Sequence, residues 1–345
     1  MKAILLKAPP EGERVCAEVS EVPIPQIGAG DLLIEMKACG LCGTDIEKAR
    51  GEYTAAMPIL GHEAVGYVTS VGEGVRDIVV GDRVFPHHHV PCHECFYCLH
   101  GNETACVAYR KSNIFPGGFS EFFRVPAWNV NKGGVIRLPS NLGFEEASLI
   151  EPTACCIRAL DKCKIAQDDY VMVVGAGPVG MLHSLLLSLR GARVIVSDIS
   201  EPRLRFAEKT EVECVIDASK RDVEHDVKSL TAGRGADVVI VASGSSKAII
   251  QALRSVRTGG KICLFGVPAK GSVLSYDFSD IYNMEIPLIP SYGTTDSETA
   301  VATELIVNYS SRFSRVITNR FHIDAFADAV KAVTSGSEMK VVITP

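Results

Sequence analysis

The stretch VMVVGAGPVG, residues 171–180, decides the fold class of this chain. Its first four residues predict a short strand, Gly175, Gly177 and Gly180 follow as G-x-G-x-x-G, and the next residues have the apolar spacing of a helix. The first glycine permits a tight turn, the second lets a pyrophosphate approach the backbone, and the third lets the helix pack closely on the strand. The stretch therefore predicts a strand–turn–helix unit that binds a dinucleotide.

The residues around this turn indicate which dinucleotide binds. Pro178 and Val179 lie at the start of the helix, whose free N–H groups and positive dipole end face the phosphates. Asp198 ends the next strand, where its carboxylate can accept hydrogen bonds from the adenosine ribose and repel a 2′-phosphate. We therefore expect NAD. NADP stays an alternative, because Arg203 follows Asp198 and can turn towards a phosphate.

Strands alternate with helices along the middle of the chain. The predicted strands lie within the apolar segments VMVVGAG, ARVIVSD, CVID, ADVVIVASG and KICLFGV. This alternation is typical of a doubly wound parallel sheet. Residues 1–150 instead contain short strands broken by Gly and Pro, and the alternation is lost after about residue 287. We predict an α/β protein with a dinucleotide-binding domain at 151–287 and a β-rich domain formed by 1–150 with 288–345.

Length, charge and the N-terminus narrow the class of protein. The chain has 345 residues, which corresponds to about two domains. Lys and Arg number 35 against 41 Asp and Glu, and the net charge of −6 argues against a nucleic-acid partner. Residues 171–189 carry no charge, but their strand–turn–helix pattern argues against a membrane span. The N-terminal MKAILLKAPP lacks the apolar core of a signal peptide, so we expect a cytoplasmic protein with reduced thiols.

Four cysteines lie close together in the first domain with the spacing C-x2-C-x2-C-x7-C: Cys92, Cys95, Cys98 and Cys106. Four thiolates at this spacing can surround one zinc ion, and a closed site of this kind is structural. An iron–sulfur cluster and two disulfides are the alternatives. A DNA-reading zinc finger is disfavoured, because residues 87–106 contain no Lys or Arg.

A second, open metal site is predicted from residues that are further apart. Cys42 lies in KACGLCGTDIE, His62 and Glu63 lie in GHEAVG, and Glu151 begins the helical segment EPTACC. A thiolate, an imidazole and a carboxylate suit a catalytic zinc that keeps one position for water or substrate. The alternatives are a hydrogen-bonded structural histidine and a redox C-x-x-C that begins at Cys39.

The order of these motifs closely resembles the zinc-dependent medium-chain alcohol and polyol dehydrogenases, in their threonine and sorbitol dehydrogenase-like branch. CGLCGTD, GHEAVG, GDRV, the four-cysteine segment, GGFSEF, the EP helix and VGAGPVG follow one another and span nearly the whole chain. The resemblance implies a GroES-like, β-rich catalytic domain and a Rossmann domain, with zinc in the cleft between them.

The resemblance also implies roles for individual metal-site residues. Cys42 and His62 correspond to catalytic zinc ligands, and Glu151 stands at the position of the third ligand. Glu63 is similar to a glutamate that exchanges with water as a transient ligand. Asp45 is expected to orient His62.

The same resemblance implies a proton relay and the chemistry of the reaction. Zinc lowers the pKa of a bound hydroxyl, and a hydride passes to the nicotinamide. Thr44 stands where the family has the hydroxyl that begins the relay. Many members have a histidine three residues later, where this chain has Glu47, so either Glu47 or water takes the proton. Lys340 aligns with a basic residue that contacts the pyrophosphate in some relatives; the alternative is a solvated surface lysine.

The substrate pocket is expected to be partly polar. His88 and Lys111 stand at positions that can line it. A polyol could pair its hydroxyl groups with His88, His89 and Glu47. A short semialdehyde acid could place its carboxylate on Lys111 or Arg110; the alternative is that these two are solvated loop charges. We favour the hydroxylated substrate, because Glu151 matches the polyol branch.

We therefore predict a zinc-dependent oxidoreductase with two zinc ions per chain that transfers a hydride between NAD(H) and an alcohol, a polyol or the corresponding carbonyl compound. The alternatives are a reductase of a short aldehyde or semialdehyde acid that uses NAD(P)H, and a non-catalytic zinc-binding protein. The resemblance implies a small-molecule substrate and a homodimer or homotetramer. Paired edges of the Rossmann sheets would form it, and MEIPLIPSYG, residues 284–293, is a candidate edge.

Overall fold

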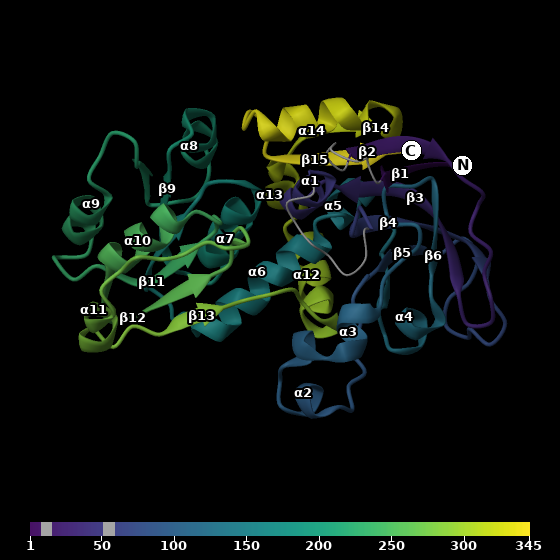
Figure 1. Cartoon of the computed structure of the whole chain (residues 1–345), viewed down its shortest axis with the longest axis horizontal. Helices are drawn as coiled ribbons and strands as arrows, with labels where there is room; N and C mark the ends of the chain where they lie inside the picture. Colours follow the sequence, from purple (N-terminus) through teal and green to yellow (C-terminus); the bar gives the residue numbers. More distant parts are fainter. Residues whose placement is uncertain (8–15, 51–58) are drawn as a thin grey trace. The chain divides into compact units, whose positions relative to one another are not determined.

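The computed structural model describes residues 1–7, 16–50 and 59–345 (Figure 1). The chain divides into two compact units, one formed by residues 1–154 with 294–345 and the other by residues 155–293. We call them the first and the second unit. The domain limits predicted at residues 150 and 287 stay a prediction, because compactness alone does not define where a domain begins to fold independently.

The second unit is built on a six-stranded parallel sheet with the order β10-β9-β8-β11-β12-β13. The chain starts in the middle at β8, adds strands towards one edge and then returns to add strands towards the other. This is the doubly wound arrangement. The strands are β8 (Tyr170–Val174), β9 (Arg193–Asp198), β10 (Cys214–Asp217), β11 (Ala236–Val241), β12 (Val256–Leu264) and β13 (Leu288–Pro290).

Helices connect these strands and leave the middle of the sheet buried. Every residue of β11 is buried, as expected for a strand covered on both faces. Met172, Ile195 and Val239 belong to the core that these strands form with the helices. The helices are α7 (Pro178–Leu189), α8 (Glu201–Ala207), α9 (Val223–Leu230), α10 (Ser246–Ser255) and α11 (Phe278–Asn283), and α6 (Ile150–Cys163) begins in the first unit and ends in the second.

The first unit contains a mixed sheet centred on β3. Its order is β14-β15-β3-β4-β5-β7, and β6 pairs with β3. Alternate residues of the first part of β3 are buried, so one face of the strand packs on a core with Ile34, Met36 and Phe123. The strands are β3 (Leu32–Gly40), β4 (Glu63–Val71), β5 (Arg83–Pro86), β6 (Phe122–Val125), β7 (Val135–Arg137), β14 (Ile317–His322) and β15 (Lys340–Thr344), with a separate hairpin of β1 (Lys2–Lys7) and β2 (Cys16–Glu21).

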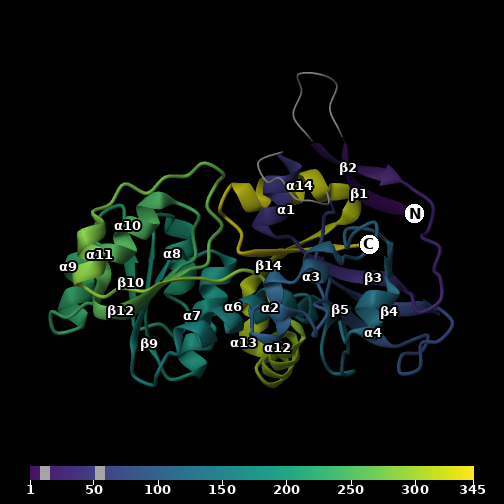
Figure 2. The same cartoon turned by 60° about the horizontal axis from the view of Figure 1, so that its bottom comes forward.

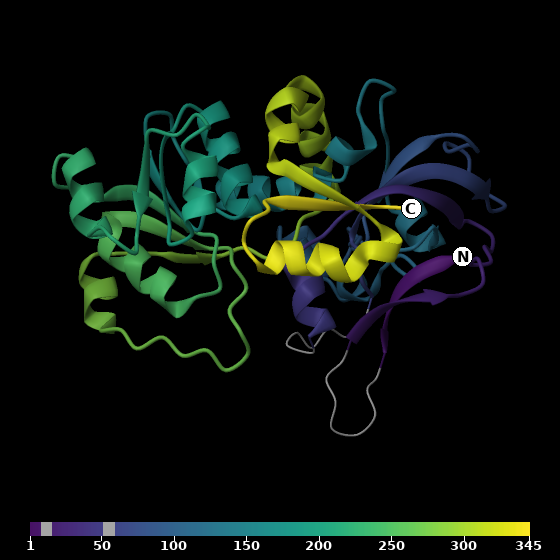
Figure 3. The ribbon, with the colours of Figure 1, turned by 90° about the horizontal axis from the view of Figure 1, so that it is seen from above.

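The C-terminal segment completes this sheet. Figure 3 shows β14, β15 and α14 (Phe326–Thr334), in yellow, beside the N-terminal strands. β15 pairs antiparallel with β3 through Val342 and Gly40, and β3 pairs with β4 through Gly40 and Glu63. The end of β3 and the starts of β4 and β15 therefore meet at one edge of the sheet.

Short helices surround the sheet of the first unit. A hydrogen bond joins Tyr109 of α3 to Thr294, just before α12, and the blue segment with α2 and α3 lies beside the yellow-green α12 in Figures 1 and 2. No helix among the described residues is long and apolar enough to cross a bilayer. The helices are α1 (Gly43–Ala49), α2 (Phe96–Leu99), α3 (Val107–Lys111), α4 (Ala127–Asn131), α5 (Phe144–Ala147), α12 (Asp296–Asn308) and α13 (Ser310–Phe313), with 3-10 turns at Glu103–Ala105, Ser314–Val316 and Ile323–Ala325.

Candidate active site and metal centres

The edge where β3, β4 and β15 meet gathers metal-binding side chains. Cys42 precedes α1, His62 precedes β4 and Glu63 is the first residue of β4. One ligand atom of each residue lies within 4.8 Å of the others. A thiolate, an imidazole and a carboxylate are donors that zinc accepts, so this group fits the open metal site predicted from the sequence.

Asp45 holds two of these residues in place. Its Oδ2 accepts a hydrogen bond from the backbone N–H of Cys42 at 3.2 Å, and its Oδ1 lies 3.4 Å from Nδ1 of His62. Burial opposes ionisation of Asp45, but its interactions with His62, with Lys48 and with the N–H of Gly61 lower its pKa below the usual value. An ionised Asp45 fixes Nδ1 of His62 as the donor and leaves Nε2 for a metal.

Lys340 forms a buried ion pair with Glu63. Its Nζ lies 2.6 Å from Oε1 of Glu63 and also contacts Oε2. Burial opposes the charge of Lys340, but Glu63 and Cys42 outweigh it and raise its pKa above the usual value. Lys340 is therefore not the solvated surface lysine that was one sequence alternative. Its predicted contact with the pyrophosphate stays a prediction.

Glu151 lies near this group but not within it. It is buried in the first turn of α6, close enough to Lys340 for the two charges to interact. It is absent from the set formed by Cys42, His62 and Glu63, among the residues that the structure describes. Its predicted role as third ligand stays a prediction.

The predicted relay residues lie on α1. The hydroxyl of Thr44 donates to Sγ of Cys42 at 3.3 Å, so it lies next to the candidate metal site. Glu47 is three residues further along the same helix and is partly buried. Side chains three residues apart share one face of a helix, and the predicted proton relay between these two positions stays a prediction.

Three consecutive histidines adjoin the metal site. The ring of His88 lies 5.2 Å from the ring of His62, centroid to centroid, and Nδ1 of His89 lies 2.7 Å from the carbonyl oxygen of Ser112. Burial lowers the pKa of His87 to about 3 and that of His89 to about 4, which keeps both rings neutral. Within the described chain, Nδ1 of His88 and both ring nitrogens of His87 are buried without a hydrogen-bonding partner.

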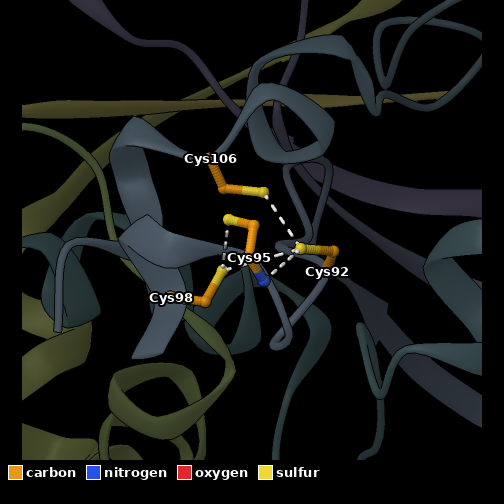
Figure 4. Close-up of side chains that lie close together, drawn as sticks. All are labelled: Cys92, Cys95, Cys98 and Cys106. Carbon is orange, nitrogen blue, oxygen red and sulfur yellow. Dashed lines mark hydrogen bonds between the residues drawn. The ribbon is translucent and has the colours of Figure 1, made fainter. Parts of the chain in front are cut away.

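The four predicted lobe cysteines converge in space (Figure 4). Their sulfur atoms lie 3.6 Å apart for Cys95 and Cys98, 3.6 Å for Cys92 and Cys106, and 3.9 Å for Cys92 and Cys98. A zinc ion with four sulfur ligands at ~2.3 Å separates them by about 3.8 Å, so the arrangement fits zinc. These separations and the free thiols contradict the alternative of two disulfides.

Tyr109 links this lobe to the start of α12. It lies on α3, directly after Cys106, and its hydroxyl accepts a hydrogen bond from the backbone N–H of Thr294 at 3.2 Å. Its ring also lies 5.1 Å from that of His89. Lys111, by contrast, is exposed at the end of α3, and its predicted place at the pocket stays a prediction.

The glycine turn of the second unit has the form that the sequence predicts. Gly175 has a φ of +105°, and a Cβ at Gly180 would lie 1.8 Å from the carbonyl oxygen of Gly175. Gly177 is the N-cap of α7, Pro178 is its first residue, and no described side chain caps the helix. The N–H groups at this helix start are therefore available to a phosphate.

Asp198 has a second role that sequence reasoning missed. Its Oδ2 accepts a hydrogen bond from the N–H of Ala176 at 2.7 Å, and its Oδ1 accepts from the N–H groups of Ile199 and Ser200. Nη1 of Arg203 lies 3.9 Å from the same carboxylate. Asp198 therefore braces the glycine turn from the neighbouring strand, and its position at the end of an apolar strand gave no sign of this.

Comparisons with known proteins agree with this geometry. Residues 28–140 match the alcohol dehydrogenase GroES-like domain, and residues 178–308 match the zinc-binding dehydrogenase domain. An L-threonine 3-dehydrogenase of Sinorhizobium fredii is 31% identical over 99% of this chain and 98% of its own, and a sorbitol dehydrogenase of Halalkalibacterium halodurans is 31% identical over 95% of both. A solved zinc-binding dehydrogenase structure from Sinorhizobium meliloti, bound to NADP, covers 100% of both chains with a TM-score of 0.88 and 28% identity.

A GroES-like domain and a Rossmann-like domain with these sites define a metal-dependent dehydrogenase. The chain belongs to the zinc-dependent medium-chain dehydrogenases, in the branch of the threonine and sorbitol dehydrogenases. It is therefore a zinc-dependent, NAD(P)-linked alcohol dehydrogenase, and the predicted family, fold class, reaction class and cofactors are confirmed.

Proposed function

We propose that this enzyme acts on an alcohol that carries a second hydrogen-bonding group close to the reacting hydroxyl, or on the corresponding carbonyl compound. The observation that carries this proposal is His88, whose buried Nδ1 has no described partner and whose ring adjoins His62. A buried polar atom without a partner costs about 1–3 kcal/mol, which a substrate hydroxyl or amine can recover. The names of the threonine and sorbitol dehydrogenases among its relatives agree with such a substrate.

We assign the catalytic zinc to Cys42, His62 and Glu151, with Glu63 as an exchangeable ligand. When bound, zinc supplies a Lewis acid that polarises the substrate oxygen, and the nicotinamide accepts the hydride. Asp45 faces Nδ1 of His62, so that Nε2 is left to bind zinc. These assignments are supported by the distances within the Cys42, His62 and Glu63 group and by the burial of Glu151 near Lys340.

Thr44 and Glu47 then carry the proton. Thr44 accepts it from the substrate hydroxyl, since its own hydroxyl already lies beside Cys42. Glu47 takes it from there as a general base. A carboxylate can replace the histidine that many family members have at this position, because both side chains are largely unprotonated at neutral pH and can act as a base.

In the second unit, we propose that Gly175, Gly177, Pro178, Val179 and Gly180 hold the pyrophosphate. Asp198 then binds the adenosine ribose and makes NAD the preferred cofactor. Arg203 lies beside Asp198 and contributes to the same subsite. Lys340 remains a proposed contact of the pyrophosphate, and its ammonium group is also paired with Glu63.

We assign a structural zinc to the four lobe cysteines, on the strength of their sulfur separations. We also propose a cytoplasmic homo-oligomer. β13 is an edge strand of its sheet, and nearby α11 exposes Phe278 and Tyr282, which are 69% and 83% accessible. Exposed aromatic side chains beside an open strand edge suit pairing with a second copy.

A substrate screen tests the proposal. Purified enzyme is assayed with NAD and NADP on simple alcohols, polyols, amino alcohols and semialdehyde acids. We expect the highest kcat/KM for a substrate with a polar neighbour to the reacting hydroxyl, and NAD as the better cofactor. Preference for an unsubstituted long-chain alcohol contradicts the polar pocket, and preference for a semialdehyde acid favours the alternative site at Lys111.

A further inference from the structure

Lys340 and Glu63 form a buried pair that three strands bring together. Lys340 begins β15, Glu63 begins β4, and both strands pair with the end of β3 at Gly40. The side chains of Lys340 and Glu63 are only 4% and 1% exposed. A Cβ at Gly40 would lie 1.8 Å from Oε2 of Glu63 and 2.7 Å from Cε of Lys340. The absence of a side chain at Gly40 therefore makes room for the pair.

Glu63 consequently has two competing partners. A carboxylate oxygen of Glu63 lies within 4.8 Å of the ligand atoms of Cys42 and His62, while its Oε1 accepts a hydrogen bond from Lys340 at 2.6 Å. A move of Glu63 onto a metal ion would leave the Lys340 ammonium buried without this carboxylate, which is strongly unfavourable. Lys340 also places a positive charge next to the site of a divalent cation.

We propose that Lys340 is a positioning residue that keeps Glu63 an exchangeable zinc ligand and thereby weakens the binding of the catalytic zinc. With Glu63 held on Lys340, a coordination position of the metal stays open for substrate. This inference rests on the proposed zinc site at Cys42, His62 and Glu151.

The test measures zinc affinity directly. Zinc-loaded protein is titrated with a chromogenic chelator, and the zinc of the four-cysteine lobe serves as an internal reference. Lys340→Met keeps the length and apolar stem of the side chain but removes its charge. We expect the catalytic zinc to be held at least about tenfold more tightly in this variant, because the positive charge beside the cation is removed and Glu63 is released to bind it. An unchanged or weaker affinity would overturn the proposal.

A double variant separates the effect from general damage. Glu63→Gln combined with Lys340→Met removes both buried charges, so it folds even if the single variant does not. We expect its zinc affinity to return to within about threefold of the parent, since coupled residues deviate from additivity. A loss of more than about tenfold would make Glu63 a permanent ligand and contradict the proposal.

Two further measurements complete the design. Cobalt in place of zinc gives a visible spectrum that reports its ligands. We expect this spectrum to change in Lys340→Met and to match the parent in the double variant.

Lys331→Met is the matched control, because Lys331 is an exposed lysine paired with Asp328. It should leave the affinity for the catalytic zinc and for the structural zinc unchanged. If Cys42→Ala retains both zinc ions, the proposed zinc site itself fails; if it loses one and Lys340→Met changes nothing, only the role of Lys340 fails.

Discussion

The carboxylate of Asp198 accepts a hydrogen bond at 2.7 Å from the backbone N–H of Ala176, in the middle of the glycine turn. This one side chain is placed for two tasks. It carries the negative charge expected to disfavour a 2′-phosphate, and it fixes the shape of the loop for which we propose pyrophosphate binding.

Replacement of Asp198 by Ala should therefore change cofactor preference and damage cofactor binding together. We expect the ratio of kcat/KM for NADP to that for NAD to rise, while kcat/KM for NAD falls by about tenfold or more because the turn loses its brace. Steady-state kinetics with both cofactors provide the measurement. Asp217→Ala is the control, since Asp217 ends the neighbouring strand β10 in register with Asp198. The NADP-to-NAD ratio of kcat/KM in this variant should equal that of the parent. A parent enzyme that prefers NADP would contradict our interpretation of Asp198.

His88→Phe tests the polar substrate pocket. Phenylalanine keeps a ring beside His62 but removes the unpartnered Nδ1. We expect kcat/KM to fall for a hydroxylated substrate. The corresponding activation free energy should rise by about 1–3 kcal/mol more than for an unsubstituted alcohol of the same length. His100→Phe, at an exposed histidine stacked on Phe96, is the control. Equal changes for both substrates would place His88 outside the recognition of the second polar group.

Cys98→Ser should weaken the fold of the first unit while leaving the catalytic group intact. Cys98 approaches Cys95 and Cys92 through its sulfur, and a structural zinc contributes directly to folding. We expect a lower Tm and the loss of one zinc ion, and a chelator should lower the Tm of the parent more than that of the variant. Cys214→Ser, in β10, serves as the cysteine control, because Cys214 belongs to neither metal-binding group. A variant that melts like the parent with its full zinc content refutes the structural site.

His183 should make stability sensitive to acid. It is fully buried on α7, and burial lowers its pKa from 6.5 to about 3. The unfolded chain binds a proton below about pH 6.5 but the folded chain does not, so stability is lost as the pH falls through this range. Between pH 7 and pH 5 the contribution is about 2 kcal/mol.

His183→Leu removes this contribution. We expect its urea midpoint, followed by circular dichroism, to fall less between pH 7 and pH 5 than that of the parent. His225→Leu, at an exposed histidine in the same unit, should keep the slope of the parent. Parallel pH dependence in His183→Leu and the parent would show that the folded state does not exclude the proton from this ring.

Short-range patterns predicted much of the fold and of the sites. The glycine turn and the four-cysteine lobe each lie within a short segment, so spacing alone brings the functional atoms together. Five of the six strands of the parallel sheet were visible as apolar runs, whereas the short β13 was not predicted as a strand. The fifth, β12, begins at Val256, ahead of the predicted segment KICLFGV that starts at Lys261. That start contains Gly259 and Gly260, which hid the strand because glycine is poor in strands.

Contacts between distant segments were not predictable in the same way. Lys340 and Glu63 are 277 residues apart, and their pairing depends on the insertion of β15 beside β3. The isolation of His183 likewise depends on Phe265, whose ring packs edge-on against it at 4.6 Å. Neither relationship leaves a periodic or spacing signal in the sequence, because each is created only when separate strands and helices pack.

Zinc content and turnover of Cys42→Ala test the central claim most directly, namely that the group around Cys42 and His62 holds the catalytic zinc. The variant leaves the four lobe cysteines untouched, so it should fold with a Tm near that of the parent and contain about one zinc ion per chain where the parent contains about two. Its kcat/KM should fall, and the activation free energy should rise by several kcal/mol, because the Lewis acid is lost. A purified Cys42→Ala enzyme that retains two zinc ions or turns over at nearly the parental rate would contradict the assignment.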